Sequence, residues 1–292
     1  MKRIVFALAA AALFSACSNQ SASTTATEAP SGAAPEQTAT AASSASPNAT
    51  PSTLNVSYDD LNGVFGANEI TQLASLGVFG APTGHFNPAK PVLRREFVRW
   101  LFNANNAIWA SDSNNLIHPA QGEPSSFTDI KTSDPDFQYI QGLQDAGISV
   151  GFPDKTFQPD VPITHEQAVA IKSALDRGGV DKDFVISKSQ PTYGYYSLPD
   201  WKDKHDISPE YVGAIATGQW DDNQNKNDPK MRVDNVPRAF GVIAMFHPKT
   251  ALTRAQAAIM LSKIGPHARA LKGIAARSVA DALSAPSPSP SP

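Results

Sequence analysis

The sequence predicts a mainly α-helical fold made of three tandem repeats. Its first indication is a phrase of Phe, a variable residue and Pro, which occurs at 86–88, 157–159 and 246–248. The second is an aliphatic residue four positions after each Pro, followed by a helix-start pattern. The third is a short helical segment before each phrase. Repeats of this length are supersecondary units that bury their apolar faces against one another, so they define the architecture.

The helix that follows each phrase has a recognisable start. Two copies carry a capping box, in which a Thr and a Gln three residues later exchange hydrogen bonds with the backbone. These pairs are Thr164 with Gln167 and Thr253 with Gln256. The first copy keeps Glu96 but has Leu93 at the cap, so we expect its helix to begin less sharply. Apolar residues then recur at helical spacing, as at Phe97, Trp100, Leu101 and Ala104.

Each repeat opens with an aromatic or apolar residue, a variable residue, an Asp and another apolar residue. The openings are Tyr58–Leu61, Phe127–Ile130 and Leu198–Trp201. Short helices are expected at 68–76, 136–146 and 209–217. The first two stop at Gly77 and Gly147, since glycine commonly follows a helix end. The third repeat is longer, and its excess is a polar run that we interpret as a surface insertion loop within 221–239.

These boundaries divide the foldable chain. The expected repeats are 54–126, 127–197 and 198–266. They are followed by an amphipathic helix within 267–285, with its apolar positions between 268 and 284, and by a Pro/Ser tail at 286–292.

The N-terminus predicts a signal peptide over residues 1–16. A basic start precedes an apolar run that is too short to span a bilayer. The run ends at Cys17, the single cysteine of the chain, and resembles a lipoprotein signal in which that cysteine is lipidated. Phe14 departs from the usual Leu, and the alternative is an ordinary secretory signal. Residues 17–53 are mostly Ser, Ala and Thr without large apolar residues, which predicts a disordered linker.

The repeated unit resembles the S-layer homology domain. Its order is aromatic-x-Asp, a short helix, Gly-Val or Gly-Ile, the stretch Gly151–Pro159, and then Ile-Thr before a helix. Three copies are similar to the usual functional unit of that family. The resemblance implies three helix-loop-helix prongs in a pseudo-threefold arrangement around a central helix bundle. It also implies binding of a peptidoglycan-linked, often pyruvylated polysaccharide between the prongs, with no cofactor.

A lipid anchor at Cys17 would join this binding to a membrane. Ser18 lacks the acidic character of an inner-membrane retention signal, which favours the outer membrane facing the periplasm. The resemblance therefore implies a tether between that membrane and the cell wall.

The first turn of each second helix carries the candidate anion ligands. Arg94 and Arg254 follow the cap, where a cation is unfavourable unless an anion such as a pyruvyl carboxylate binds there. Free backbone N–H groups and the guanidinium would then converge on it. Arg95 could substitute for Arg94, and His165 replaces Arg in the second copy, where a neutral imidazole is a weak anion partner. The alternative is a solvated or ion-paired side chain.

Other residues are candidates for sugar contacts. Asp60, Asp129 and Asp200 could bind hydroxyl groups, but we favour the interpretation that they cap the turns that follow them. Trp201 could stack on a sugar ring or fill the core. Gly84 lies in the loop before Phe86, where a left-handed turn or a close ligand approach requires glycine.

Composition and motifs argue against other classes. The net charge of −3 and the lack of a Lys/Arg run do not favour nucleic-acid binding. The six histidines show no metal-ligand spacing, and no nucleophile elbow or phosphate loop occurs. We therefore expect no enzyme and no metal. A wall-active glycan hydrolase built from distant carboxylates is one alternative, and a degenerate module for protein–protein contact is another.

Overall fold

The computed structural model describes residues 53–122, 124–148, 151–178, 195–266 and 274–285. The signal peptide, Cys17, nearly all of the 17–53 linker and the Pro/Ser tail lie outside the described residues. The described residues belong to one compact unit of the chain, Ala45–Pro292.

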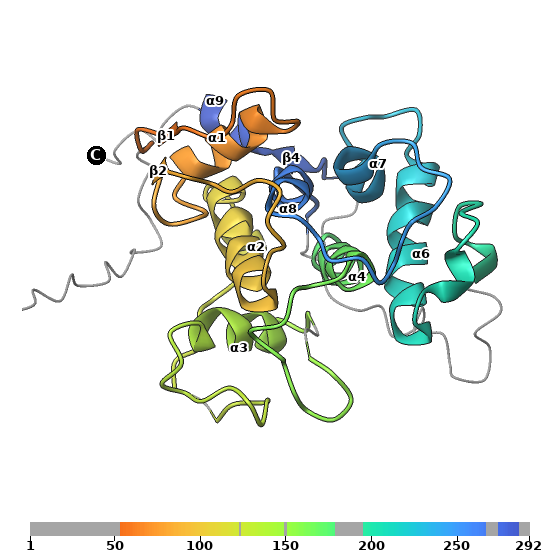
Figure 1. Ribbon diagram of the computed structural model, residues 1–292, viewed down its shortest axis with the longest axis horizontal. Helices are drawn as coiled ribbons and strands as arrows, with labels where there is room; N and C mark the ends of the chain where they lie inside the picture. Colours follow the sequence, from red (N-terminus) through yellow and green to blue (C-terminus); the bar gives the residue numbers. More distant parts are fainter. Residues whose placement is uncertain (1–52, 123, 149–150, 179–194, 267–273, 286–292) are drawn as a thin grey trace, which may run out of the picture. The chain divides into compact units, whose positions relative to one another are not determined.

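The described fold is mainly helical, as the sequence predicts (Figure 1). In chain order the elements are β1 (Ser57–Tyr58), α1 (Ala67–Ser75), β2 (Thr83–Gly84), α2 (Arg94–Ile108), η1 (Ser113–Asn115), α3 (Phe137–Asp145), α4 (His165–Leu175), η2 (Lys204–Asp206), α6 (Pro209–Gln224), α7 (Asn235–Phe240), α8 (Arg254–Leu261), β3 (Lys263–Ile264), β4 (Arg277–Ser278) and α9 (Val279–Ser284). Strands β1 and β2 pair in parallel, and β3 pairs antiparallel with β4. None of the described helices is long and apolar enough to cross a bilayer.

The helices pack between repeats in a cyclic order. Helix α2 packs against α3 of the next repeat, α4 packs against α6, and α8 of the third repeat returns to α1 of the first. Figure 1 shows α4 beside α6 and α2 above α3. The α4–α6 contact is close, since a Cβ added to Gly218 would lie 2.6 Å from the Ser173 hydroxyl oxygen. Each second helix is therefore covered by the first helix of another repeat.

A closed ring of backbone hydrogen bonds lies at the centre of this arrangement. The aliphatic residue that follows each phrase donates its N–H to the carbonyl of another such residue. The three bonds run from Val92 to Leu252 at 2.9 Å, from Leu252 to Ile163 at 2.8 Å and from Ile163 to Val92 at 3.1 Å. All three side chains have no exposed surface. This ring gives the expected pseudo-threefold relation a direct physical basis.

The helix ends mostly follow the sequence signals. Both Thr–Gln capping boxes form, with the Thr164 and Thr253 hydroxyls accepting from the backbone N–H three residues later. At the first copy Glu96 accepts from the Leu93 N–H at 2.9 Å, but the Leu93 side chain has no acceptor. Gly77 and Gly147 adopt φ angles of 76° and 80°, as expected of glycines beyond a helix end.

Two expected elements differ in extent. Helix α6 continues to Gln224 and α7 follows at 235–240, so the insertion is partly helical and not simply a loop. The cause is a tertiary contact, because the Asp222 carboxylate accepts hydrogen bonds from the N–H groups of Val233 and Asp234. Near the C-terminus the described helix covers Val279–Ser284, shorter than the expected span, while 267–273 lie outside the described residues.

Candidate functional site

The predicted ligand residues lie at the contacts between repeats, which we name seams. In the first seam the start of α2 (residues 93–96) contacts the loop at 157–161. In the second, 164–167 contact 246–250, and in the third, 253–256 contact 86–90. The same two components, a helix start and a loop, therefore meet three times, which makes the seams directly comparable.

The backbone N–H groups at the helix starts are already bonded at every seam. Those of the first helical residue donate to loop carbonyls, from Arg94 to Val161, His165 to Thr250 and Arg254 to Lys90, each at 2.9 Å. Those of the second donate from Arg95 to Pro159, Glu166 to Pro248 and Ala255 to Pro88. We expected these N–H groups to be free for an anion. The structure corrects that argument, because a neighbouring repeat supplies the acceptors that a helix start lacks.

Arg254 lies across the third seam. Its Nε donates to the Phe86 carbonyl at 2.7 Å and its Nη1 to Glu96 at 2.8 Å. The guanidinium lies 4.9 Å from the centre of the Phe86 ring and 4.5 Å from that of Trp100. Its side chain is 15% exposed. Arg254 thus joins the third repeat to the first, and its side chain keeps a small exposed surface.

Arg94 takes the equivalent position at the first seam but is buried. It is 2% exposed and donates to the side chain of Gln167 at 3.3 Å. Its guanidinium lies over the rings of Phe152 and Phe157, at 4.4 and 5.2 Å from their centres. Burial lowers the pKa of Arg94 to about 10, although the charges of Tyr211 and Asp129 oppose this shift.

His165 completes the set at the second seam. It is 6% exposed, its Nδ1 lies 3.1 Å from the Phe246 carbonyl oxygen, and its ring centre is 4.5 Å from that of Phe240. Burial lowers the pKa of His165, which favours a neutral imidazole at pH 7. The three equivalent residues thus all pack on the Phe of another repeat's phrase.

In α2 and α4 the charged second residue also crosses its seam, but its sign differs between the two, and α8 has Ala255 at this position. Arg95 pairs with Asp134 and Asp136 at 3.1 Å and with Asp160 at 2.8 Å. Burial alone would lower the pKa of Arg95. Its hydrogen bonds to these carboxylates have the larger effect, so the pKa of Arg95 is raised. At the equivalent position Glu166 pairs with Lys249 at 2.6 Å, so the polarity is reversed.

A second set of equivalent side chains holds the repeated phrase. One Asp in each repeat accepts the N–H groups of the Phe and of the residue after it, at 2.6 to 2.9 Å. These are Asp60, Asp129 and Asp203. The residue after each Phe has a positive φ of 53° to 59°, an unfavourable conformation that these bonds help to hold. Asp60 and Asp129 therefore brace a turn more than 25 residues downstream and do not cap the turn that follows them.

The third member corrects the sequence alignment. We expected Asp200, but it is fully exposed and pairs with Lys204 at 3.4 Å. Asp203 instead accepts the two N–H groups of the third phrase, so the opening of the third repeat is Trp201-Lys202-Asp203. Trp201 is 5% exposed and stacks on Phe246, with ring centres 4.7 Å apart, as Tyr58 and Phe127 contact their own phrases. The aromatic-x-Asp pattern could have found this register.

Gly84 has the left-handed conformation that we expected, with φ 85°. A Cβ added there would have no neighbour within 4 Å, so backbone conformation and not close packing explains the glycine. Lys155, the matching residue of the second repeat, adopts φ 63° without being glycine.

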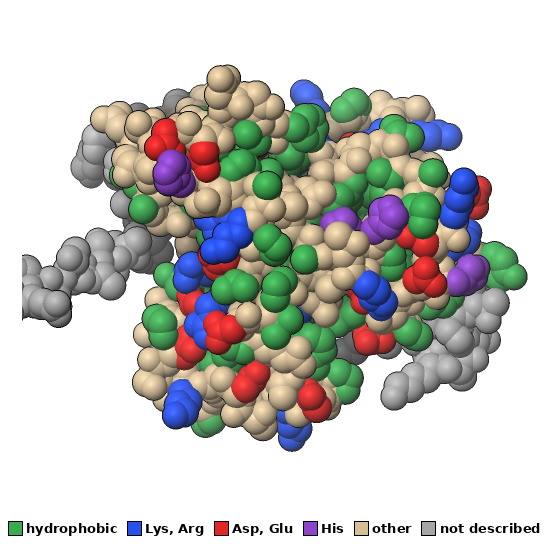
Figure 2. All heavy atoms as spheres, in the orientation of Figure 1, with side chains coloured by type: hydrophobic (Ala, Val, Ile, Leu, Met, Phe, Trp, Pro, Cys, Tyr) green, Lys and Arg blue, Asp and Glu red, His purple; other side chains and the backbone are tan. Residues whose placement is uncertain are grey.

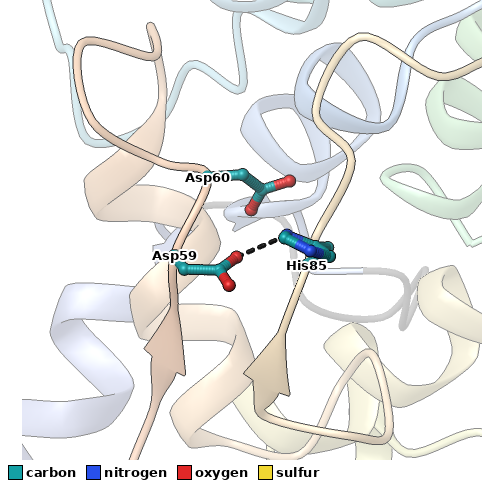
Figure 3. Close-up of side chains that lie close together, drawn as sticks. All are labelled: Asp59, Asp60 and His85. Carbon is teal, nitrogen blue, oxygen red and sulfur yellow. Dashed lines mark ion pairs between the residues drawn. The ribbon is translucent and has the colours of Figure 1, made fainter.

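One further cluster was not indicated by sequence spacing. Asp59 and His85 follow the paired strands β1 and β2, and the His85 Nδ1 lies 2.5 Å from an Asp59 oxygen (Figure 3). Asp60 lies beside them, and potential metal-ligand atoms of the three residues lie within 4.8 Å of one another. His85 and Asp59 are largely exposed, and Asp60 already accepts two N–H groups. The cluster mainly joins the two strands.

Charged side chains are mixed on the face drawn in Figure 2, where Lys and Arg lie close to Asp and Glu. This agrees with the ion pairs at the seams. An anion that binds on this face would therefore be recognised by individual side chains and not by a large field of one sign.

Comparison with known protein families finds a match for two of the three repeats. The profile of the S-layer homology domain matches residues 57–98 and 126–169. Each match runs from the aromatic-x-Asp opening through the short helix and the phrase into the second helix. These two segments are therefore similar to the S-layer homology domain, a module that binds cell-wall polysaccharides. No curated protein matches this chain.

Proposed function

We propose that the chain is a non-catalytic, lipid-anchored protein that tethers a membrane to the cell wall. Cys17 would carry the lipid, and the outer membrane facing the periplasm would hold it. The folded repeats would bind a peptidoglycan-linked, pyruvylated polysaccharide. The S-layer homology matches support wall binding in general. The signal-like N-terminus and Ser18 support the anchor and its membrane.

We also propose that residues 198–266 form a third S-layer homology repeat. Three structural features support it. Asp203 braces the phrase as Asp60 and Asp129 do, Leu252 closes the backbone ring, and α8 packs on α1. The insertion after α6 and the shifted opening account for its weaker likeness to the other two copies.

The observation that carries the binding proposal is the placement of Arg254. Among the four predicted anion ligands, Arg94 and His165 are buried, and Arg95 contacts three carboxylates. The Nη2 of Arg254 has no hydrogen-bond partner in the part of the chain that the structure describes, while Nε and Nη1 are fixed. A pyruvyl carboxylate could therefore accept from a pre-oriented guanidinium. We place the principal anion contact at the third seam, with Gly84 in the adjoining loop.

The test is co-sedimentation with purified sacculi. The full chain with Cys17→Ser, which cannot be lipidated, would be mixed with sacculi before and after acid removal of the attached polysaccharide. We expect binding to the untreated sacculi and its loss after treatment. Binding that survives treatment would move the ligand to bare peptidoglycan, and no binding to either would reject the tether.

Variants assign the contact. Arg254→Ala should weaken binding about tenfold or more, since a charge-assisted hydrogen bond is worth roughly 1.5–3 kcal/mol. Arg277→Ala is the control, because Arg277 contacts Trp109 and Ser111 away from the seams. Circular dichroism would confirm that each variant is folded. Unchanged retention of folded Arg254→Ala would remove this residue from the site, and release of soluble wall fragments would favour a hydrolase.

A further inference from the structure

The third repeat contains a cavity of about 610 Å³. A cavity of this size is typical of small-ligand sites. Its walls come from the segment before η2, from the second half of α6 and from the insertion that follows. The charged residues of the lining are Asp222, Lys226, Arg232 and Asp234. None of them belongs to a seam, so the cavity is separate from the glycan contact proposed above.

The extra residues of the third repeat build this cavity. Helix α6 has 16 residues, whereas the equivalent helices α1 and α3 have nine each. The lining residues of α6 lie in its second half, which the shorter helices lack. The 225–234 segment then leads to α7 and supplies Lys226, Arg232 and Asp234 to the lining. Among the described residues, the first two repeats have no equivalent of this longer helix and insertion.

Key charged groups of the cavity are fixed by the protein itself. The Asp222 carboxylate accepts from the Val233 N–H at 2.8 Å and from the Asp234 N–H at 3.1 Å. The Asp234 side chain in turn accepts from the Nε of Arg232 at 2.9 Å. A carboxylate and a guanidinium are thus oriented before any ligand arrives, which reduces the entropic cost of binding.

The lining carries both signs of charge in balance. Asp222 and Asp234 contribute two carboxylates, while Lys226 and Arg232 contribute two cations. A ligand with one charge would be attracted by one pair and repelled by the other. A ligand with a cationic and an anionic end can satisfy both, and the apolar residues Leu198, Pro199 and Pro237 can contact its carbon atoms.

Asp222 is the better placed of the acids to receive a cation. Burial raises its pKa to about 6, although the two backbone N–H groups lower it, and the nearby charges of Asp234 and Asp176 add to the rise. At neutral pH the two backbone N–H groups therefore offset only part of the cost of burying the ionised carboxylate. An ammonium group beside it would offset that cost.

We propose that this cavity binds a zwitterionic ligand of the amino-acid or peptide type, with its ammonium group at Asp222 and its carboxylate at Lys226 and Arg232. The peptide branches of peptidoglycan carry groups of this kind. The site would add a peptide contact to the glycan contact at the seams. The proposal of this site depends on the cavity alone, so the result of the sacculus experiment neither supports nor contradicts it.

Calorimetric titration of the full chain carrying Cys17→Ser tests the proposal. The probes are alanylalanine, its N-acetyl derivative, which is only anionic, and its amide, which is only cationic. We expect alanylalanine to bind at neutral pH. Each blocked derivative should bind at least about tenfold more weakly, since each loses one charge-assisted contact. Equal affinity for a blocked derivative, or no binding of alanylalanine at about 10 mM, would overturn the proposal.

A matched pair of lysine variants locates the contact. Lys226→Ala removes a cation of the lining from an exposed position, so its folding should be preserved. Lys230→Ala removes an exposed lysine of the same insertion that is not part of the lining. We expect the first to weaken alanylalanine binding about tenfold and the second to leave it unchanged. Equal effects would contradict the assignment. Asp222→Asn is the second variant. We expect it to lose affinity for the amide as well as for alanylalanine.

Discussion

At the scale of single residues, the same few side chains hold each repeat together. One Asp braces the phrase, the buried Phe of the phrase contacts the aromatic residue that opens its repeat, and the first residue of a second helix packs on that Phe from another repeat. The predicted ligand residues are therefore also structural residues. Tests of binding must separate the two roles, which is why each proposed variant has a control for folding.

The Asp brace gives the first prediction. Asp203→Ala leaves the N–H groups of Phe246 and His247 without their acceptor, and the Phe246 N–H is buried. We expect a loss of about 2–4 kcal/mol in the free energy of unfolding, measured by urea denaturation. Asp200→Ala, which changes a fully exposed residue, should have no measurable effect. The reverse order of these two effects would restore Asp200 to the motif.

Asp222 gives a prediction for pH. Its pKa is raised from 3.8 to about 6, so ionisation opposes folding above pH 6 and that penalty disappears as the pH falls towards 4. The free energy of unfolding of the wild type, relative to Asp222→Asn, should therefore rise between pH 7 and pH 4. After allowance for partial exposure the rise should be on the order of 1–2 kcal/mol. Denaturant titrations at several pH values measure it, and a flat difference would contradict the raised pKa.

Sequence patterns predicted residues well wherever the partner is local. The capping Thr residues, Gly77 and Gly147 act within one turn of helix, and their roles are confirmed. Asp203 was missed because the third opening was aligned on Leu198-Pro199-Asp200, although Trp201-Lys202-Asp203 also fits the aromatic-x-Asp pattern. The bonding of the helix-start N–H groups was missed because another repeat supplies the acceptors. Whether the arginines bind polysaccharide stays a prediction.

At the scale of elements, the incomplete cap of α2 is a testable weakness. Leu93 cannot accept the N–H that Thr164 and Thr253 accept in the other repeats. Leu93→Thr should be more stable than Leu93→Val by about 1 kcal/mol, because the two side chains have the same shape and only Thr offers an oxygen. Thermal denaturation of both variants measures the difference. Equal stability would show that Glu96 and the neighbouring loop already suffice.

The elements that departed from expectation are those fixed by long-range contacts. The polar composition of the insertion favoured a loop, but the Asp222 bonds to Val233 and Asp234 hold the end of α6 in place. The helical periodicity between 268 and 284 predicted a longer helix, yet within the described residues β4 pairs with β3 and α9 begins after it. Local pattern cannot weigh a competing partner in another part of the chain.

At the scale of the whole molecule, closure of the ring joins the first repeat to the last. The third seam connects Arg254 with Phe86, 168 residues apart, and α8 covers α1. We therefore expect the three repeats to unfold together in a single transition. A chain that ends at residue 197 should lose this cooperative transition in urea, followed by circular dichroism. A truncated chain with an unchanged midpoint would show that two repeats are stable alone.

The cyclic order of the seams also sets a rule for stoichiometry. Each repeat offers one face that donates a helix start and one face that receives it, which is a heterologous contact that closes after three steps. A polypeptide with three such units saturates itself and leaves no open face for another copy. A chain with one or two units would have to borrow the missing ones from other chains. The number of repeats in a polypeptide can therefore decide whether such a protein works as a monomer or must assemble.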